Sequence, residues 1–138
     1  MSTVPAVQDD DKNIDPRVIA VFQDIRETRG SDFINNFWRY IAFDPALLER
    51  TWGEVKDVMA TPSELDPMVK EMIYAAVSIA NSCTYCIHSH TAAARAKGMT
   101  DAQYADFLRV VSLAAKTNHI VNGLQIPVDP EFDQDAGR

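Results

Sequence analysis

Residues 66–90, DPMVKEMIYAAVSIANSCTYCIHSH, contain one whole helical pattern and the beginning of another. Asp66 suits the cap of a helix that starts at Pro67, because aspartate accepts a hydrogen bond from the free N–H groups of the first turn. Proline suits the first helical position, because the N–H that it lacks would have no partner within the helix. Apolar residues at helical spacing continue to Ala80, and the polar Asn-Ser pair at 81–82 suits a turn and a new helix start. This stretch predicts two consecutive helices joined by a tight turn.

The same signals recur on both sides of this stretch. Asp-Pro pairs at Asp15 and Asp44 each precede apolar residues at helical spacing, and Thr100 with Gln103 has the form of a capping box. No alternating strand pattern of useful length is present. We therefore predict an all-α fold of about six helices, over roughly residues 16–29, 32–43, 45–59, 67–80, 83–97 and 101–123.

Composition limits the class of protein. The 138 residues, 46% of them hydrophobic, suit one globular domain, which we place at residues 15–126 between disordered tails at 1–14 and 127–138. A net charge of −7 argues against nucleic acid or an anionic membrane as a partner. The start has no secretory-signal pattern, and the longest uncharged apolar stretch, 72–80, is too short to span a membrane. We therefore expect a cytoplasmic protein.

The second predicted helix concentrates sulfur and imidazole side chains. Its first turns hold both cysteines of the chain and two of its three histidines. At about 100° per residue, Cys83, Cys86 and His90 share one face, whereas His88 lies about 140° from Cys83. A zinc site would need ligands on both sides of this helix, so we predict no metal. A thioredoxin-type pair is not indicated, since it would accompany a βαβ pattern.

The shared face suits thiol chemistry. A cysteine in the first turn of a helix lies near unpaired N–H groups, which favour the thiolate. His90, one turn after Cys86, can exchange a proton with that thiol. If one sulfur is oxidised to a sulfenic acid, the other can condense with it to a disulfide, which an outside thiol can reopen.

The preceding helix offers an acid for this site. Glu71 is followed at helical spacing by Ala75, Ser78 and Ser82, a stripe of small residues that lets a neighbouring backbone come close. A glutamate here could hydrogen-bond a histidine and set its tautomer. The simpler alternatives are a solvated Glu71 and cysteines that serve only as small core residues.

Together these residues resemble a known signature. Glu71, eleven intervening residues, and then Cys83-x-x-Cys86-x-x-x-His90 are similar to the E-x11-C-x-x-C-x-x-x-H pattern of AhpD-like alkylhydroperoxidases, within the carboxymuconolactone decarboxylase superfamily. The helices from about residue 15 to residue 126 resemble its peroxidase-related branch.

The resemblance implies an AhpD-like helical fold that assembles into trimers or hexamers, and a thiol-dependent peroxidase for small alkyl hydroperoxides. It implies that Cys86 attacks the peroxide, that Cys83 resolves the sulfenic acid, and that His90 and Glu71 relay protons. It also implies no bound cofactor. The disulfide would be returned to thiols by an external thiol donor, such as a lipoylated adaptor protein.

The chain departs from this pattern at one position. The best-known members of the family carry a second relay histidine directly before the second cysteine, and here that residue is Tyr85, whose hydroxyl is a poor proton acceptor near neutral pH. Tyr85, His88 and Ser78 are therefore candidates only for supporting roles. Two other functions stay open: a lactone-processing enzyme of the carboxymuconolactone decarboxylase type, and a non-enzymatic redox-sensing oligomer.

Overall fold

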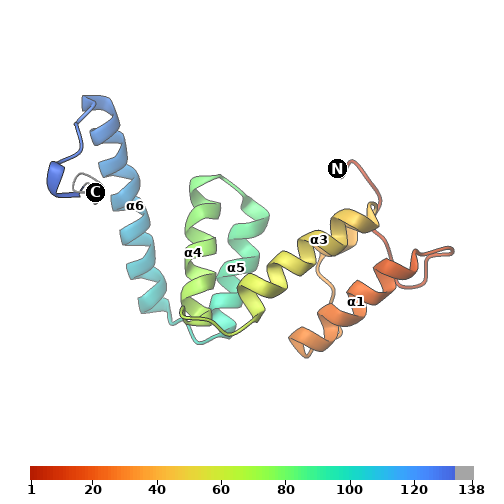
Figure 1. Ribbon diagram of the computed structural model, residues 1–138. Helices are drawn as coiled ribbons and strands as arrows, with labels where there is room; N and C mark the ends of the chain where they lie inside the picture. The colour runs from red at the N-terminus through yellow and green to blue at the C-terminus, as the bar shows by residue number, and fades with distance from the viewer. Residues whose placement is uncertain (133–138) are drawn as a thin grey trace. The chain divides into compact units, whose positions relative to one another are not determined.

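The computed structural model describes residues 1–132, and residues 133–138 lie outside the description. Within residues 1–132 there are helices and no strands, as predicted (Figure 1). The α-helices are α1 (Pro16–Arg29), α2 (Asn36–Ile41), α3 (Pro45–Val55), α4 (Pro67–Ala80), α5 (Thr84–Ala96) and α6 (Asp101–Leu124). A π-helical turn at Lys56–Ala60 follows α3, and Pro130–Phe132 forms a 3-10 turn. In this part of the chain no helix is both long and apolar enough to cross a membrane.

The helix starts follow the predicted caps. The carboxylates of Asp15, Asp44 and Asp66 accept hydrogen bonds from the backbone N–H two residues later, at 2.8, 3.0 and 2.9 Å. At the start of α6, the Thr100 hydroxyl accepts from the Gln103 N–H while the Gln103 side chain accepts from the Thr100 N–H. These bonds satisfy N–H groups that have no partner within the helix, and so they fix where each helix begins.

Two predicted helices differ in length from the structure. The helix expected over 32–43 occupies only Asn36–Ile41, with Asn35 in the extended conformation before it. The helix expected to reach Met59 is α-helical only to Val55, because the hydrogen-bonding pattern then widens to a π turn. That turn closes with the Thr61 N–H donating to the Lys56 carbonyl, five residues back, at 3.0 Å.

The chain forms two compact units, Met1–Glu64 and Leu65–Arg138, where the sequence predicted one helical domain over 15–126. The division falls in the exposed segment between the π turn and α4, which contains Pro62. The hydrophobic core cluster lies in the first unit, whereas the buried apolar residues of the second unit are Ala75, Ala94, Met99 and Phe107. Apolar composition over the whole chain could not reveal this uneven distribution.

In the first unit, α1 lies beside α3 (Figure 1) and the core fills the space around them. The Trp52 indole donates a hydrogen bond of 2.6 Å to Asp24, and Lys56 pairs with the same carboxylate at 2.9 Å. The indole ring is thereby buried with its polar N–H satisfied. The buried core consists of Val18, Val21, Phe22, Ile25, Ile34, Trp38, Ala42, Leu48 and Trp52.

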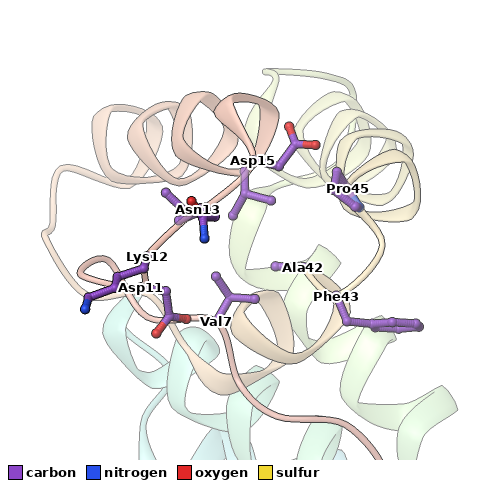
Figure 2. A pocket seen from close by; sticks show the side chains of 10 residues that line it. Val7, Asp11, Lys12, Asn13, Asp15, Ala42, Phe43 and Pro45 are labelled. Carbon is purple, nitrogen blue, oxygen red and sulfur yellow. The ribbon is translucent and has the colours of Figure 1, made fainter.

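The N-terminal segment differs from the disordered tail that we expected over residues 1–14. The Val7 N–H donates to the Arg39 carbonyl at 2.9 Å, and the Asp9 carboxylate pairs with Arg26 at 2.7 Å and Arg39 at 2.8 Å. Residues 7–15 also form one wall of a hollow of about 300 Å³, opposite Ala42, Phe43 and Pro45 (Figure 2). That hollow is lined by no cysteine or histidine. Of the C-terminal tail expected over 127–138, residues 133–138 lie outside the described residues.

In the second unit, α4 and α5 run side by side in opposite directions, joined by a short turn (Figure 1). The face of α4 that is buried carries Glu71, Ala75 and Ser78. Helix α6 also contacts α4, but only one of its residues, Phe107, is buried. The second unit thus presents the predicted Glu71 stripe and the cysteine helix as one closely packed pair.

Candidate active site

The α4 side of the site is a buried stripe of small and polar residues. Glu71, Ala75 and Ser78 are only 7%, 2% and 4% exposed. This burial excludes the alternative of a solvated Glu71. The Ser78 hydroxyl donates to the Tyr74 carbonyl at 2.7 Å, which satisfies the hydroxyl inside the helix. Small side chains at this spacing let α5 approach closely enough for its thiols and histidine to reach α4.

The turn between the helices places the first cysteine at the start of α5. The Cys83 N–H donates to the Ser78 carbonyl at 2.9 Å, after Ser82 has taken a left-handed conformation with a φ of 56°. Cys83 then caps α5, and its Sγ accepts a hydrogen bond from the Cys86 N–H at 3.4 Å. Such a bond favours the thiolate, because the N–H dipole points at the sulfur.

The pKa values of the two thiols shift in opposite directions. Hydrogen bonds from the Cys86 thiol and the Cys86 N–H hold the pKa of Cys83 below its ordinary value. Burial, and then the hydrogen bond and charge of Cys83, raise the pKa of Cys86 to about 11, although Ser78 acts in the opposite direction. Since two interacting thiols titrate as a pair, the first proton leaves more readily than that of an ordinary thiol and the second less readily. Cys83 is therefore the more acidic of the two thiols, and Cys86 donates a hydrogen bond to it.

The histidine is bound by the predicted acid. Nδ1 of His90 lies 2.7 Å from Oε2 of Glu71, and the two residues come from α5 and α4. The other oxygen of Glu71 accepts a bond of 3.1 Å from Nζ of Lys97, the residue that caps the C-terminal end of α5. One buried carboxylate thus joins an imidazole and an ammonium group, so its own charge is compensated.

These partners keep Glu71 ionised. Burial alone would raise the pKa of its carboxyl, but the hydrogen bonds and charges of His90 and Lys97 outweigh burial, and the pKa lies below the ordinary value. An ionised carboxylate only accepts hydrogen bonds, so Nδ1 of His90 carries a proton. Nε2 is then the nitrogen of the neutral ring that can take another proton.

Of the other candidates, Ser78 contacts both cysteines, whereas His88 and Tyr85 are exposed. His88 is exposed, in keeping with its predicted place on the other side of α5, and Tyr85 is 44% exposed. Two residues of the site were not predicted from the sequence. Lys97 donates a hydrogen bond to Glu71, and the ring of Tyr74 stacks on that of His90. Lys97 could have been found, because a residue seven positions after His90 shares its face. Among the described residues, no group of three or more histidine, cysteine and acidic side chains is placed to hold a metal ion.

Comparison with known proteins agrees with the arrangement of these residues. The model of the carboxymuconolactone decarboxylase family matches residues 45–129, which include the whole signature. The chain belongs to the carboxymuconolactone decarboxylase family. A search of curated proteins gave no match.

Within the carboxymuconolactone decarboxylase family, the chain is similar to a solved structure over almost its whole length. This is the alkylhydroperoxidase AhpD core from Rhodospirillum rubrum, which is 60% identical with a TM-score of 0.94. The match covers 98% of this chain and 99% of the other. The predicted AhpD-like helical fold and the resemblance to AhpD-like proteins are thereby confirmed.

Proposed function

We propose that this chain is a thiol-dependent peroxidase that reduces small alkyl hydroperoxides with the Cys83–Cys86 pair. The observation that carries this proposal is the 2.7 Å contact between Glu71 and His90 beside two partly buried free thiols. The 60% identity to a protein described as an alkylhydroperoxidase supports the same activity. Proton exchange with the thiols explains why a buried acid–histidine pair accompanies a C-x-x-C pair.

The first half of the proposed reaction oxidises one thiol. Following the resemblance, the Cys86 sulfur attacks the terminal oxygen of the hydroperoxide, the O–O bond breaks, and the alkoxide leaves as an alcohol after taking a proton from water. Cys86 must first lose its own proton. Nε2 of His90, one turn along the same face, can take that proton, which leaves His90 as the imidazolium.

The second half closes the disulfide. The Cys83 sulfur attacks the sulfenic acid of Cys86, and hydroxide leaves as water after taking a proton from the imidazolium of His90. Two electrons have then passed from the thiol pair to the peroxide. An external dithiol returns the pair to its reduced form by exchange through a mixed disulfide. We propose a thiol donor protein for this step, with a lipoylated adaptor as one candidate, and a reducing location such as the cytoplasm.

Hydroperoxide consumption tests this function directly. The purified chain is mixed with tert-butyl or cumene hydroperoxide and either dithiothreitol or dihydrolipoamide. The wild type should consume peroxide and should lose two thiols per chain when no reductant is present. Cys83→Ser and Cys86→Ser should each abolish turnover, whereas Ser31→Ala, in the first unit, should leave it unchanged. Unchanged thiol content after stoichiometric peroxide would refute the proposal.

The family name favours one other function, a lactone-processing decarboxylase. That chemistry has no requirement for a pair of thiols. Turnover of a carboxymuconolactone-type substrate that survives both cysteine substitutions would therefore support it. A redox-sensing oligomer would instead form the disulfide with peroxide and show no turnover with either dithiol.

We also propose that the chain assembles into trimers or hexamers. The support is the exposed apolar surface of α6, which a monomer would leave in water. Light scattering at micromolar concentration should give a mass three or six times that of the chain, and a monomer would contradict the proposal. The exposed apolar residues of α6 are Leu108, Val110, Leu113, Ile120, Val121 and Leu124.

A further inference from the structure

The imidazole of His90 is held by two side chains of α4. Its ring stacks on that of Tyr74, with 3.7 Å between the ring centroids and 20° between the planes. Its Nδ1 edge meets Glu71, one turn before Tyr74 on the same helix. Tyr74 is 39% exposed, so the stack borders solvent while the carboxylate end is buried. Tyr74 thus holds one face of the imidazole ring, and Glu71 holds its Nδ1 edge.

Orientation of this ring decides which nitrogen is available for proton transfer. With Glu71 ionised, Nδ1–H donates to the carboxylate and Nε2 is left to exchange a proton. A rotation of the imidazole out of its plane about the Cβ–Cγ bond would break the Glu71 contact. Because Tyr85 occupies the place of a second relay histidine, the proposed proton transfer depends on His90 alone and therefore on this orientation.

We propose that Tyr74 is a positioning residue: its ring, stacked on His90, keeps Nδ1 on Glu71 and leaves Nε2 free on the face that carries Cys86. This inference rests on the proposed peroxidase function, in which Nε2 exchanges the proton. The stack opposes rotation out of the ring plane because a tilted imidazole would lose its parallel contact with the phenol ring, and within that plane the Glu71 carboxylate selects the Nδ1 edge. Tyr74 lies outside the E-x11-C-x-x-C-x-x-x-H pattern, so this role belongs to the chain and not to the signature.

The ring of Tyr74, and not its hydroxyl, carries this role. Burial and the negative charges of Cys86, Cys83 and Glu71 raise the pKa of the phenol, so it stays protonated while the first thiol ionises. It is therefore a poor base for either cysteine. Phenylalanine keeps the stack and should replace tyrosine, whereas leucine keeps the bulk of an apolar residue and removes the stack.

The test compares Tyr74→Phe with Tyr74→Leu by two measurements. The ¹⁵N and ¹H shifts of the His90 side chain report its tautomer without any turnover, and kinetics with tert-butyl hydroperoxide and dithiothreitol report kcat and KM. Wild type and Tyr74→Phe should show one Nδ1–H tautomer and kcat values within twofold. Tyr74→Leu should show mixed tautomers and a kcat about tenfold lower, with KM within twofold.

The control variant is Tyr104→Leu, which removes a different aromatic stack of the second unit, that between Tyr104 and Phe107, and should change neither reading. If Tyr74→Leu does not fold, Tyr74→Met gives the same loss of the stack with a flexible side chain. The proposal is overturned if the leucine or methionine variant keeps the wild-type tautomer, whatever its rate, or if Tyr74→Phe loses as much rate as Tyr74→Leu. A wild type without peroxidase turnover would refute the proposed function alone, since the tautomer measurement still decides the role of Tyr74.

Discussion

Glu71 and His90, nineteen positions apart in the sequence, meet at 2.7 Å between Oε2 and Nδ1. The contact crosses from α4 to α5 and is buried on the glutamate side, where only 9% of the side chain is exposed. It fixes the tautomer of the histidine that adjoins the thiol pair. The chemistry of the site should therefore respond to changes that leave both cysteines in place.

Glu71→Gln should slow peroxide turnover strongly. Glutamine has nearly the same size and can still bond His90, but its neutral amide neither requires a proton on Nδ1 nor stabilises the imidazolium formed during proton transfer. We expect kcat/KM to fall by about 10²-fold, the usual scale for a disturbed acid–base relay. Steady-state kinetics with dithiothreitol measure this, and Glu64→Gln, at an exposed position, serves as control. Equal rates for the two variants would contradict a role for Glu71.

Lys97→Met should raise the pH at which the protein begins to lose stability on acidification. The folded-state pKa of Glu71 lies below its ordinary value. Ionised Glu71 therefore stabilises the folded protein at any pH above the ordinary value, and this stabilisation is lost as the pH falls through the folded-state pKa. Without Lys97, burial is opposed by His90 alone and the folded-state pKa rises. The loss of stability should then begin at a higher pH than in the wild type.

Thermal unfolding measured between pH 3 and pH 7 checks this prediction. Lys116→Met, which removes a charge from an exposed position on α6, should leave the shape of the pH profile unchanged. If Lys97→Met and Lys116→Met give the same profile, the bond between Lys97 and Glu71 has no influence on the titration of the carboxyl.

The sequence was sufficient to place the signature residues because helical periodicity determines faces. Asp66-Pro67 located the start of α4, and the spacing put Cys83, Cys86 and His90 on one side of α5. Because a tight turn joins the two helices, α4 must pack against α5. Its stripe of small residues then places Glu71 opposite these three side chains. The stack of Tyr74 on His90 was beyond this reasoning, since it depends on side-chain rotamers and on how closely the two helices approach.

Other parts of the fold needed information that local patterns do not contain. The acidic N-terminal residues predicted a solvated tail, and only the arginines of α1 and α2, which are distant in sequence, explain why Asp9 is held. The split at Glu64 depends on which segments contact one another, and composition does not report that. The relative acidity of Cys83 and Cys86 depends on the burial of Cys86 and on one N–H and one S–H hydrogen bond at the start of α5.

The thiol pair should titrate in two widely separated steps. In Cys86→Ala the Cys83 thiolate loses its S–H donor, so its pKa should rise toward the ordinary value. In Cys83→Ala the charge that opposes ionisation of Cys86 is removed, so the pKa of Cys86 should fall from about 11. Thiolate absorbance near 240 nm against pH measures both. If both variants moved in the same direction, the hydrogen bond between the two thiols could not be the cause.

Trapping the sulfenic acid identifies the sulfur that attacks. After one equivalent of hydroperoxide, a sulfenic-acid reagent such as dimedone should label Cys86 in Cys83→Ser, as the resemblance implies. Labelling of Cys83 in Cys86→Ser at a higher rate would instead assign the attack to Cys83, the more acidic thiol. Mass spectrometry of the peptide that carries residues 82–95, prepared from each variant over time, distinguishes the two results.

Asp9→Asn should destabilise the first unit, because Asp9 bridges Arg26 and Arg39 on two different helices. Half-exposed ion pairs are worth little, so we expect a loss of about 0.5–1 kcal/mol at neutral pH. The two arginines hold the pKa of Asp9 below its ordinary value. The stabilisation is therefore present above that ordinary value, and the difference between variant and wild type should shrink as the pH falls toward 3.

Chemical denaturation at pH 7 and pH 3 measures this difference, and the neighbouring Asp10→Asn is the matched control. Hydrogen exchange adds a local reading, because the Val7 N–H donates to the Arg39 carbonyl and should be protected in the wild type. Asp9→Asn should accelerate that exchange, since the segment then keeps fewer bonds to α1 and α2. Rapid exchange of the Val7 N–H in the wild type would show that residues 1–14 behave as the disordered tail that the sequence alone predicts.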